Sequence, residues 1–257
     1  MKLLRFFNRV VAFLTWSFGI YIFMIIIPSV IYRKKDFSRQ ISLWGRGLVK
    51  ILGINVIEKN KKPEQSGDII ISNHYGLHEI PVLLSYYPAI FAVKDQCRKS
   101  FVTGRMLKKV GNIFIDPENP SKRTVALIKL VKKLKRGKRV IVFPEGEFTP
   151  GSKRKPFNAG PFHAAKKMNK KIQACVIDSP NDRNAISWNK NGNLLFQLFD
   201  FFSRKKVDVS IRFFDPVTVD EDPAKFANKW KRKIEMELEK NEMENIVPDE
   251  ERIFLTA

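Results

Sequence analysis

The amino-acid sequence predicts an α/β fold, in which a mixed and mostly parallel sheet is flanked by helices and preceded by an N-terminal helical segment that anchors the chain to a membrane. Two observations lead to this prediction. From residue 53 onward, short apolar runs typical of buried strands alternate with longer stretches of helical periodicity. Before that point, residues 10–32 carry no charged side chain and are rich in Phe, Ile and Val. We therefore expect membrane-associated helices over residues 1–52 and a globular α/β domain over residues 53–257.

The N-terminal apolar run is long enough to cross a bilayer if it forms a helix, because each helical residue adds about 1.5 Å. It is longer than the apolar part of a cleaved signal peptide, so we expect a retained anchor. Lys and Arg residues lie on both sides of residues 10–32, so positive charge does not fix a direction of crossing. Pro28 leaves two alternatives open. The run is either one spanning helix or a segment that breaks at Pro28 and returns to the same face of the membrane.

After the anchor, an amphipathic helix is expected over residues 38–52, with Ile41, Trp44 and Leu48 on one side and Gly53 as its stop. Seven short apolar runs then follow, each bounded by turn residues. The sequence predicts strands over residues 55–57, 69–71, 90–93, 113–115, 140–143, 172–177 and 207–214.

Two further helices have clear end signals. One begins at Ser121, a good N-cap residue, and closes at Gly137. The last helix begins at Asp222 and Pro223 and leads into an acidic tail. Residues 194–202 contain four Phe residues, which suits either core packing or a second membrane contact, and core packing is the commoner role of such a run.

The charge balance limits the classes of partner. The chain has 47 Lys and Arg against 26 Asp and Glu, a formal net charge of +21, which attracts anionic lipid, nucleic acid or acidic proteins. No RNA-reading aromatic motif, zinc finger or helix-turn-helix supports nucleic acid, whereas anionic headgroups explain positive charge beside an apolar anchor. Cys97 and Cys175 lack metal-type spacing and predict no disulfide framework. A non-catalytic, basic membrane-surface binding protein remains one alternative.

The run 73–79 carries the clearest chemistry, because His74 and Glu79 directly follow a predicted buried strand. An imidazole accepts a proton near neutral pH, and a carboxylate bonded to its other nitrogen orients it. On one regular helix the two side chains would diverge by about 140°. His74 must therefore lie in a loop before the helix that carries Glu79. The alternative is a capping or core histidine.

A second acidic turn follows the predicted strand at 140–143, where Pro144, Glu145 and Gly146 end the apolar run. The ends of parallel strands in α/β sheets are where ligands bind. We expect this turn and His74 to share one cleft.

A different class of function is a zinc-dependent hydrolase that uses His74, His78 and His163 as ligands. His74 and His78 would share one helical face, but their order relative to Glu79 matches no familiar zinc signature. We expect His163 instead to be a helix residue packed near the cleft.

Four motifs in register resemble the glycerophospholipid acyltransferases, over about residues 52–216. These are Asn73-His74 with an acid at Glu79, then residues 111–116, then 143–146, then 157–165. The branch that they resemble most is 1-acylglycerol-3-phosphate acyltransferase.

The resemblance implies an O-acyltransferase that moves a fatty acyl group from acyl-CoA or an acyl carrier protein thioester to a lysophospholipid hydroxyl, with 1-acylglycerol-3-phosphate as acceptor. It implies no metal or other cofactor, and a place at the cytoplasmic face of a bacterial inner membrane. By analogy, His74 is the general base and Glu79 orients it. Glu145 and Gly146 line the acceptor site, and Lys94 matches a lysine near the acceptor.

The chain departs from the family's usual pattern at four positions. Glu79 stands where the family usually has Asp, which keeps the charge but alters its reach, Glu147 stands where it usually has Thr, and Pro117 and Phe148 stand where it usually has Arg. The two missing arginines concern the acceptor more than the reaction. Arginine grips phosphate with two parallel hydrogen bonds. Either the acceptor is not a phosphomonoester, or other basic residues replace the missing cations: Lys122, Arg123, Lys153, Arg154 or Lys155. Lys153 and Arg154 are our candidates for binding the acceptor.

Overall fold

A computed structural model describes residues 1–33, 36–99, 103–116, 118–179, 181–189 and 192–246. Within these residues the centre is a seven-stranded sheet of order β1-β7-β6-β2-β5-β3-β4. The strands are β1 (Ile54–Glu58), β2 (Ile69–Ser72), β3 (Ile90–Lys94), β4 (Ile113–Ile115), β5 (Val140–Val142), β6 (Ile172–Asp178) and β7 (Val207–Phe213). All seven predicted strands are confirmed, each to within one residue at either end.

The sheet is mixed and mostly parallel, as predicted. β2 pairs in parallel with both β5 and β6, and β3 pairs in parallel with β4 and β5. β7 runs antiparallel to β6 and parallel to β1. The carboxyl ends of β6, β2, β5 and β3 therefore lie side by side at one edge of the sheet, where α/β proteins place their sites.

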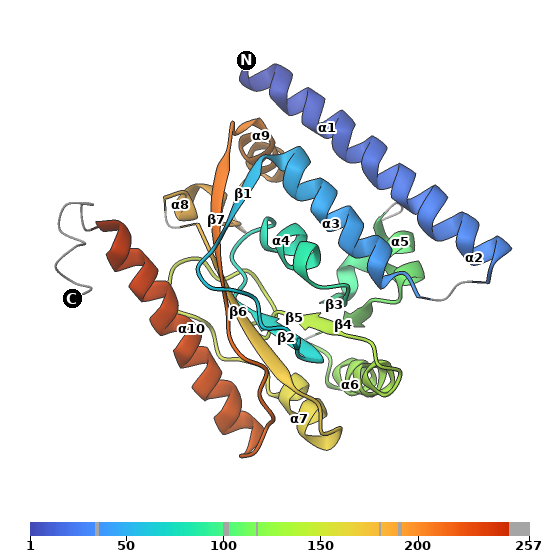
Figure 1. The fold of residues 1–257 in the computed structure, drawn as a ribbon, viewed down its shortest axis with the longest axis vertical. Coiled ribbons are helices and arrows are strands. Elements are labelled where there is room, and N and C mark those ends of the chain that lie inside the picture. Colours follow the sequence, from blue (N-terminus) through green and yellow to red (C-terminus); the bar gives the residue numbers. More distant parts are fainter. Residues whose placement is uncertain (34–35, 100–102, 117, 180, 190–191, 247–257) are drawn as a thin grey trace.

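Helices cover both faces of the sheet. Figure 1 shows α3 and α4 on one side and α10 on the other, where it packs on β6 and α7. The helices are α1 (Lys2–Gly19), η1 (Ile20–Ile26), α2 (Ile27–Ile31), α3 (Ser38–Leu52), α4 (Glu79–Tyr86), η2 (Asp95–Lys99), α5 (Thr103–Val110), α6 (Pro120–Lys135), α7 (Gly160–Lys167), α8 (Arg183–Ile186), α9 (Leu194–Ser203) and α10 (Pro223–Ile246). Because both faces are covered, every residue of β2, β5 and β6 is buried.

The helix ends follow the local signals in the sequence, with one correction. Gly53 ends α3 in the left-handed conformation, at a φ of 68°. The Asp222 carboxylate accepts hydrogen bonds from backbone N–H groups in the first turn of α10. The N-cap of α6 is Asn119 and not Ser121, because the Asn119 side chain accepts the Lys122 N–H and Pro120 fits the first helical turn.

Of the two alternatives left open at Pro28, the structure has the continuous helix. Residues Lys2–Ile31 form one 30-residue helix that is long and apolar enough to cross a membrane. A proline usually disrupts a helix, because it lacks an N–H and clashes with the carbonyl one turn earlier. Here the helix continues, since the π-helical stretch η1 directly before α2 widens it at that point. The chain reverses after α2 instead, and α3 returns antiparallel to α1. The Trp16 indole donates to the Trp44 carbonyl at 3.2 Å, and the Trp44 indole donates to the Ser17 hydroxyl at 2.9 Å.

The helix α9 packs against α1, which only partly confirms the expectation of core packing for residues 194–202. The Phe6 ring lies 5.0 Å from that of Phe199, and the Phe13 ring lies 5.9 Å from that of Phe202. The opposite face is open, since Leu195 and Phe196 are 75% and 70% exposed.

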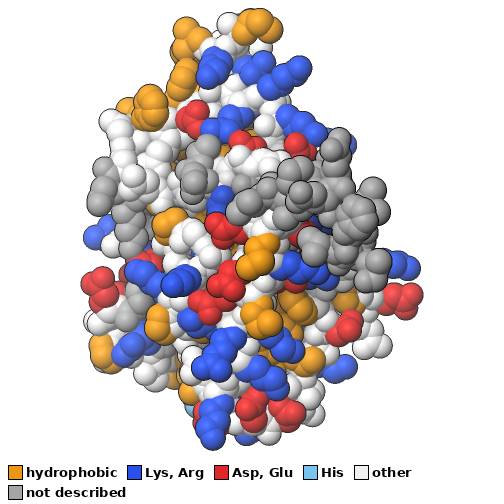
Figure 2. Space-filling view, turned by 90° about the vertical axis from the view of Figure 1, so that its left-hand side faces the viewer, with side chains coloured by type: hydrophobic (Ala, Val, Ile, Leu, Met, Phe, Trp, Pro, Cys, Tyr) orange, Lys and Arg blue, Asp and Glu red, His pale blue; other side chains and the backbone are white. Residues whose placement is uncertain are grey.

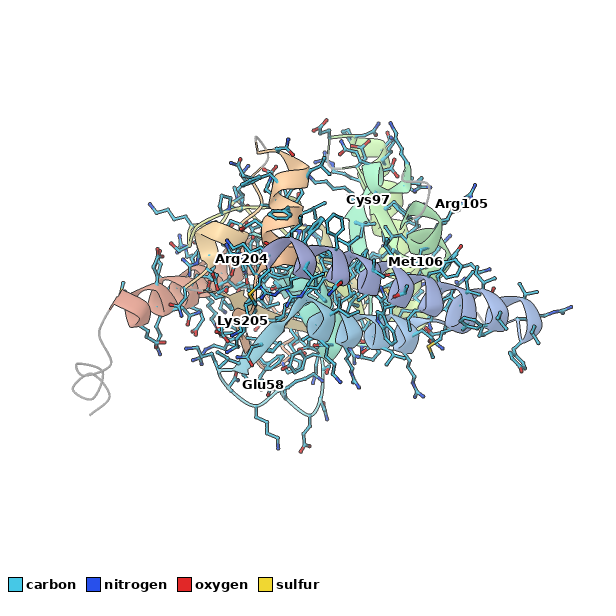
Figure 3. The ribbon with its side chains drawn as sticks, turned by 90° about the horizontal axis from the view of Figure 1, so that it is seen from above. Glu58, Cys97, Arg105, Met106, Arg204 and Lys205 are labelled. Atoms are coloured by element: carbon cyan, nitrogen blue, oxygen red, sulfur yellow. The ribbon has the colours of Figure 1, made fainter. Side chains whose placement is uncertain are left out.

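Two arginines of α1 bond the C-terminal end of α9. Arg5 donates to the Ser203 carbonyl at 2.8 Å, and Arg9 donates to the Arg204 carbonyl at 2.5 Å and the Lys205 carbonyl at 3.2 Å. Figure 3 shows Arg204 and Lys205 beside the N-terminal half of α1. These bonds satisfy carbonyls that a helix end leaves without partners.

The close approach of α3 to α4 gives a test of the packing. A Cβ atom on Gly45 would lie 2.5 Å from the Leu84 Cβ, whereas one on Gly19 would meet no atom within 4 Å. We expect Gly45→Ala to lower stability by about 1–3 kcal/mol through overpacking. The matched change Gly19→Ala should stabilise by about 0.5–1 kcal/mol, because alanine favours a helix. Thermal unfolding in detergent measures both, and a Gly45→Ala protein as stable as wild type would contradict this packing.

Candidate active site

The candidate site lies at the edge of the sheet where parallel strands end. The loop 73–78 follows β2, the loop 143–159 follows β5, and Lys94 is the last residue of β3. Because β5 and β3 lie in order on one side of β2, these segments meet although they are far apart in sequence.

His74 and Glu79 are in direct contact. His74 lies in the loop before α4, and Glu79 is the first residue of that helix. The His74 Nδ1 atom is 2.5 Å from Glu79 Oε2. The five-residue separation of His74 and Glu79 required His74 to lie in a loop before the helix that carries Glu79, and the structure has this arrangement.

The Glu79 carboxylate also organises the loop. Its Oε1 atom accepts the Tyr75 N–H at 2.7 Å, and its Oε2 atom accepts the Gly76 N–H at 3.3 Å. The side chain has no solvent exposure and lies at the N-terminus of α4, where the helix dipole favours negative charge. Glu79 is therefore both the partner of the His74 ring and the acceptor for backbone donors of the loop.

Burial governs the charge of this pair. It lowers the pKa of His74 to about 3, and the nearby charges of Lys94 and Arg154 act in the same direction, while Glu145 opposes them. Burial also raises the pKa of Glu79 to about 7, against the attraction of His78 and the Tyr75 and Gly76 N–H groups. The imidazole is consequently neutral at pH 7, the state in which it accepts a proton.

Asn73 fixes the loop to the neighbouring strand. Its side-chain amide donates to the Ile177 carbonyl at 2.7 Å, and its side-chain oxygen accepts the Ile177 N–H at 2.9 Å. From the sequence, Asn73 is placed only in the Asn73-His74 motif. Its place directly after a buried strand was the available signal, because a side-chain amide there can pair like a further strand residue.

Glu145 lies against the loop 73–78, called the base loop from here on, as expected of the second acidic turn. Its Oε1 atom accepts the His74 N–H at 3.2 Å and lies 3.4 Å from Arg154 Nη1. Burial raises the pKa of Glu145, and Arg154 opposes this shift. Gly146 follows in the left-handed region, with a φ of 74° that makes the turn possible.

The candidate cations differ in where they lie. The Arg154 guanidinium is completely buried and also donates to the Gly151 and Ser152 carbonyls. Lys94 and Lys153 are exposed, and the charge of Lys94 reaches His74. Of the other residues proposed as substitutes, Lys122 pairs with Asp116 and Lys155 with Glu147, and Arg123 is exposed. Pro117 is outside the described residues.

The three histidines do not converge. His163 is exposed on α7, close enough to Asp222 to lower the pKa of that carboxyl, and is not packed near the cleft as we expected. His78 is buried with its ring 4.9 Å from that of Tyr75, and burial lowers its pKa to about 4. The described residues contain no group of three His, Cys, Asp or Glu side chains that could hold a metal ion. The geometry does not fit the zinc site of the alternative hydrolase.

Aromatic rings enclose His74 on both sides. The Phe143 ring stacks on the imidazole at 3.7 Å and 7°, and the Phe148 ring lies 4.1 Å away on a tilt of 34°. Trp188 lies 5.5 Å beyond Phe148. No sequence pattern marks Trp188, which reaches the site because β6 and β2 are neighbours.

A narrow cavity adjoins the base loop. It is lined by Leu77 of that loop, by residues 186–188 and by the inner face of α9: Leu77, Ile186, Ser187, Trp188, Gln197, Leu198 and Phe201. Its wall is mostly apolar, and α9 separates it from α1.

Comparison with known proteins gives consistent matches. Residues 53–178 match the family model described as Acyltransferase. The 1-acyl-sn-glycerol-3-phosphate acyltransferase of Neisseria gonorrhoeae is 26% identical over 203 residues, which cover 77% of this chain and 79% of that protein. The lyso-ornithine lipid O-acyltransferase of Pseudomonas aeruginosa is 26% identical over 139 residues, which cover 54% of this chain and 53% of that protein.

The fold also has a match among solved structures. The 1-acyl-sn-glycerophosphate acyltransferase from Thermotoga maritima superposes with a TM-score of 0.66, at 21% identity, and the match covers 92% of this chain and 97% of that chain. The two chains share one fold.

The electrostatics of the His74–Glu79 pair predict an unusual titration. Because burial lowers the pKa of His74 to about 3, its ring should stay neutral as the pH falls from 8 to 5. A histidine in a model peptide titrates at about 6.5. Nitrogen NMR of histidine-labelled protein measures this, with each of the three histidines assigned from its His→Asn variant. Titration of His74 between pH 6 and 7 would contradict the burial argument.

Proposed function

We propose that this chain is an acyltransferase of the family whose model matches residues 53–178, and that it moves a fatty acyl group from an acyl thioester to the free hydroxyl of a lysophospholipid, with His74 as general base. The relative from Neisseria is named for 1-acyl-sn-glycerol-3-phosphate, which makes this lipid the first acceptor to test. The reaction would place the protein in phospholipid biosynthesis.

The contact between His74 Nδ1 and Glu79 Oε2 is the observation that carries the proposal. A carboxylate that accepts the Nδ1 proton leaves Nε2 as the nitrogen that takes the proton of the acceptor hydroxyl. As that proton leaves, the hydroxyl oxygen attacks the thioester carbon. The carbon–sulfur bond breaks, and the thiolate leaves and receives the proton from the imidazolium. The ester bond forms without a covalent intermediate on the protein.

The surroundings of the pair suit this reaction. The rings of Phe143 and Phe148 exclude water from both faces of the imidazole, and a thioester is less exposed to hydrolysis in such a site. The net charge of +21 favours an anionic donor, either acyl-CoA or an acidic acyl carrier protein.

We further propose that residues 1–52 hold the catalytic part, residues 53–257, at a membrane, on the cytoplasmic face of a bacterial inner membrane. Apolar side chains recur on the exposed face of α1 every three or four residues: Leu4, Phe7, Val11, Leu14 and Phe18. Figure 2 shows apolar side chains gathered at the tip where the N-terminus lies in Figure 1, with Lys and Arg side chains directly below them. Apolar insertion and anionic headgroups would act together there.

The catalytic proposal predicts transfer that depends on one imidazole. We expect purified protein to acylate 1-acylglycerol-3-phosphate from a labelled acyl thioester, and His74→Ala to lower kcat by about 100- to 10,000-fold. His163→Ala is the matched control, because His163 is exposed on α7, where its charge acts on Asp222. Mass spectrometry of the lipid product gives the readout with acyl-CoA and with acyl carrier protein as donors. Full activity in His74→Ala, or no transfer by wild type to any lysophospholipid, would refute the proposal.

The membrane proposal predicts that the exposed stripe of α1 drives attachment. We expect Val11→Asp with Leu14→Asp to release the protein from phosphatidylglycerol–phosphatidylethanolamine vesicles in a flotation assay, because charged side chains oppose insertion. The control carries the same change at Val125 and Ile128 of α6, which are also exposed and three residues apart. Equal flotation of both variants would show that α1 is not the contact.

A further inference from the structure

The helix α6 has a strongly one-sided charge. Residues 120–136, the helix and its C-cap residue, contain seven Lys and Arg and no Asp or Glu. This segment alone accounts for a third of the net charge of +21. Its buried residues are Ala126, Leu130 and Leu134, which face the body of the domain, where α6 packs on β4, β5 and α7. The positive charge therefore lies on the outer side of the helix.

Three lysines of α6 have no acidic partner. Lys129, Lys132 and Lys135 are exposed, and among the residues that the structure describes none pairs with a carboxylate of the chain. Like charges three or four residues apart repel each other and destabilise a helix. Burial and two neighbouring cations lower the pKa of Lys133 between them, so the positive charges are crowded. The fold gains nothing from these charges.

The helix α10 is also rich in cations but has the ordinary arrangement. Several of its lysines pair with acids one or two turns away: Lys229 with Glu221, Lys231 with Glu235 and Lys240 with Glu244. The unpaired charge of α6 is therefore not a general property of cationic helices in this protein. It points to a negatively charged partner outside the chain.

Two apolar side chains lie within the charged surface. Val125 and Ile128 are 49% and 51% exposed. They share one side of the helix with Lys129 and Lys132, because residues three and four apart are neighbours on a helix surface. We call these four residues the α6 face. Apolar contacts at the centre and charged contacts around them are typical of an interface between two proteins, so the α6 face fits the surface of an acidic protein.

The α6 face is remote from the proposed membrane contact. Figure 1 shows α1 along the upper side of the molecule and α6 at the lower side, with α3, α4 and part of the sheet between them. Lipid headgroups bound along the exposed stripe of α1 therefore do not reach the α6 face. This position favours a soluble partner over a lipid surface.

The same helix begins at the edge of the sheet that carries the candidate site. β4 runs parallel to β3, and α6 is the next helix after β4, so its first turn lies near the carboxyl ends of both strands. There Lys122 pairs with Asp116 and lies 3.8 Å from Asp95, the residue that follows β3. A protein seated on α6 is thus beside the edge at which His74 lies, and a thioester on a flexible arm reaches the base from there.

We propose that the α6 face is the docking surface for an acidic acyl carrier protein, which delivers the fatty acyl group as a thioester on its prosthetic arm. This inference rests on the proposed function and specifies its donor. Acidic side chains of the carrier contact Lys129 and Lys132, and Val125 and Ile128 form the apolar centre of the interface. During transfer the carbon–sulfur bond breaks, the acyl group passes to the acceptor oxygen, and the acceptor proton passes through His74 to the sulfur. The carrier leaves as a free thiol.

The test compares two donors that carry the same palmitoyl chain, a bacterial acyl carrier protein and coenzyme A, with 1-acylglycerol-3-phosphate as acceptor. Lys129→Glu with Lys132→Glu should raise KM for the carrier about tenfold or more, because like charges then face each other across the interface. The kcat values and KM for palmitoyl-CoA should stay as in wild type. The reversal removes repulsion within the helix, so the variant should unfold at no lower temperature than wild type.

Two further variants separate charge from apolar contact. Lys225→Glu with Arg232→Glu makes the same change in charge at exposed positions of α10 and should leave both KM values unchanged. Val125→Ser with Ile128→Ser keeps the charge and should raise KM for the carrier alone. Biolayer interferometry of the carrier on immobilised enzyme measures the same differences without any transfer of the acyl group.

The outcomes separate the docking surface from the reaction itself. If the Lys129/Lys132 variant keeps the wild-type KM for the carrier, the surface is refuted and the acyltransferase proposal stands. The same follows if transfer from both donors falls equally, or if the variant no longer floats with phosphatidylglycerol vesicles. If wild type transfers from neither donor, the proposed function fails, and interferometry decides on the surface alone. Equal binding of the carrier by wild type and variant then refutes it, and a tenfold loss in the variant supports it.

Discussion

The buried carboxylate of Glu79 is the constraint on which the site depends. It receives the His74 ring on Oε2 and the Tyr75 N–H on Oε1, with the Gly76 N–H as a third donor. A carboxylate without such partners would be costly in the protein interior, by several kcal/mol. The turn between β2 and α4 is therefore folded around this side chain, and the orientation of the imidazole follows from the same hydrogen bonds. A glutamate, one methylene longer than the aspartate expected from related sequences, reaches all three donors here.

A second constraint is the central position of β2 between β5 and β6. Pairing with β6 lets Asn73 extend the ladder through Ile177, and pairing with β5 brings Glu145 to the His74 N–H. Glu145 in turn holds Arg154, whose side chain is completely buried. Removing either charge would leave the other buried and unpaired, so the pair is better regarded as part of the scaffold than as a phosphate-binding group.

The contrast between what the sequence predicts and what it misses follows from the range of the interactions. The strands and the His74–Glu79 contact are local, since apolar runs define the former and one loop and one helix define the latter. Lys153 and Arg154 cannot be told apart from the sequence, because only the distant Glu145 decides which one turns inward. His163 was expected near the cleft, but the buried face of α7 consists of its neighbours Phe162, Ala164 and Ala165. Trp188 meets Phe148 only through strand order.

The helix α9 connects the N-terminal helix α1 to the candidate site. One side of it packs on α1 through Phe199 and Phe202, and its end is bonded by Arg5 and Arg9. Its inner side, with Leu198 and Phe201, forms a wall of the cavity beside the base loop. The helix α1 therefore supports one wall of the cavity, and α9 cannot shift without disturbing both. The position of α9 thus joins the membrane contact that we propose for α1 to the catalytic pair that we propose at His74 and Glu79.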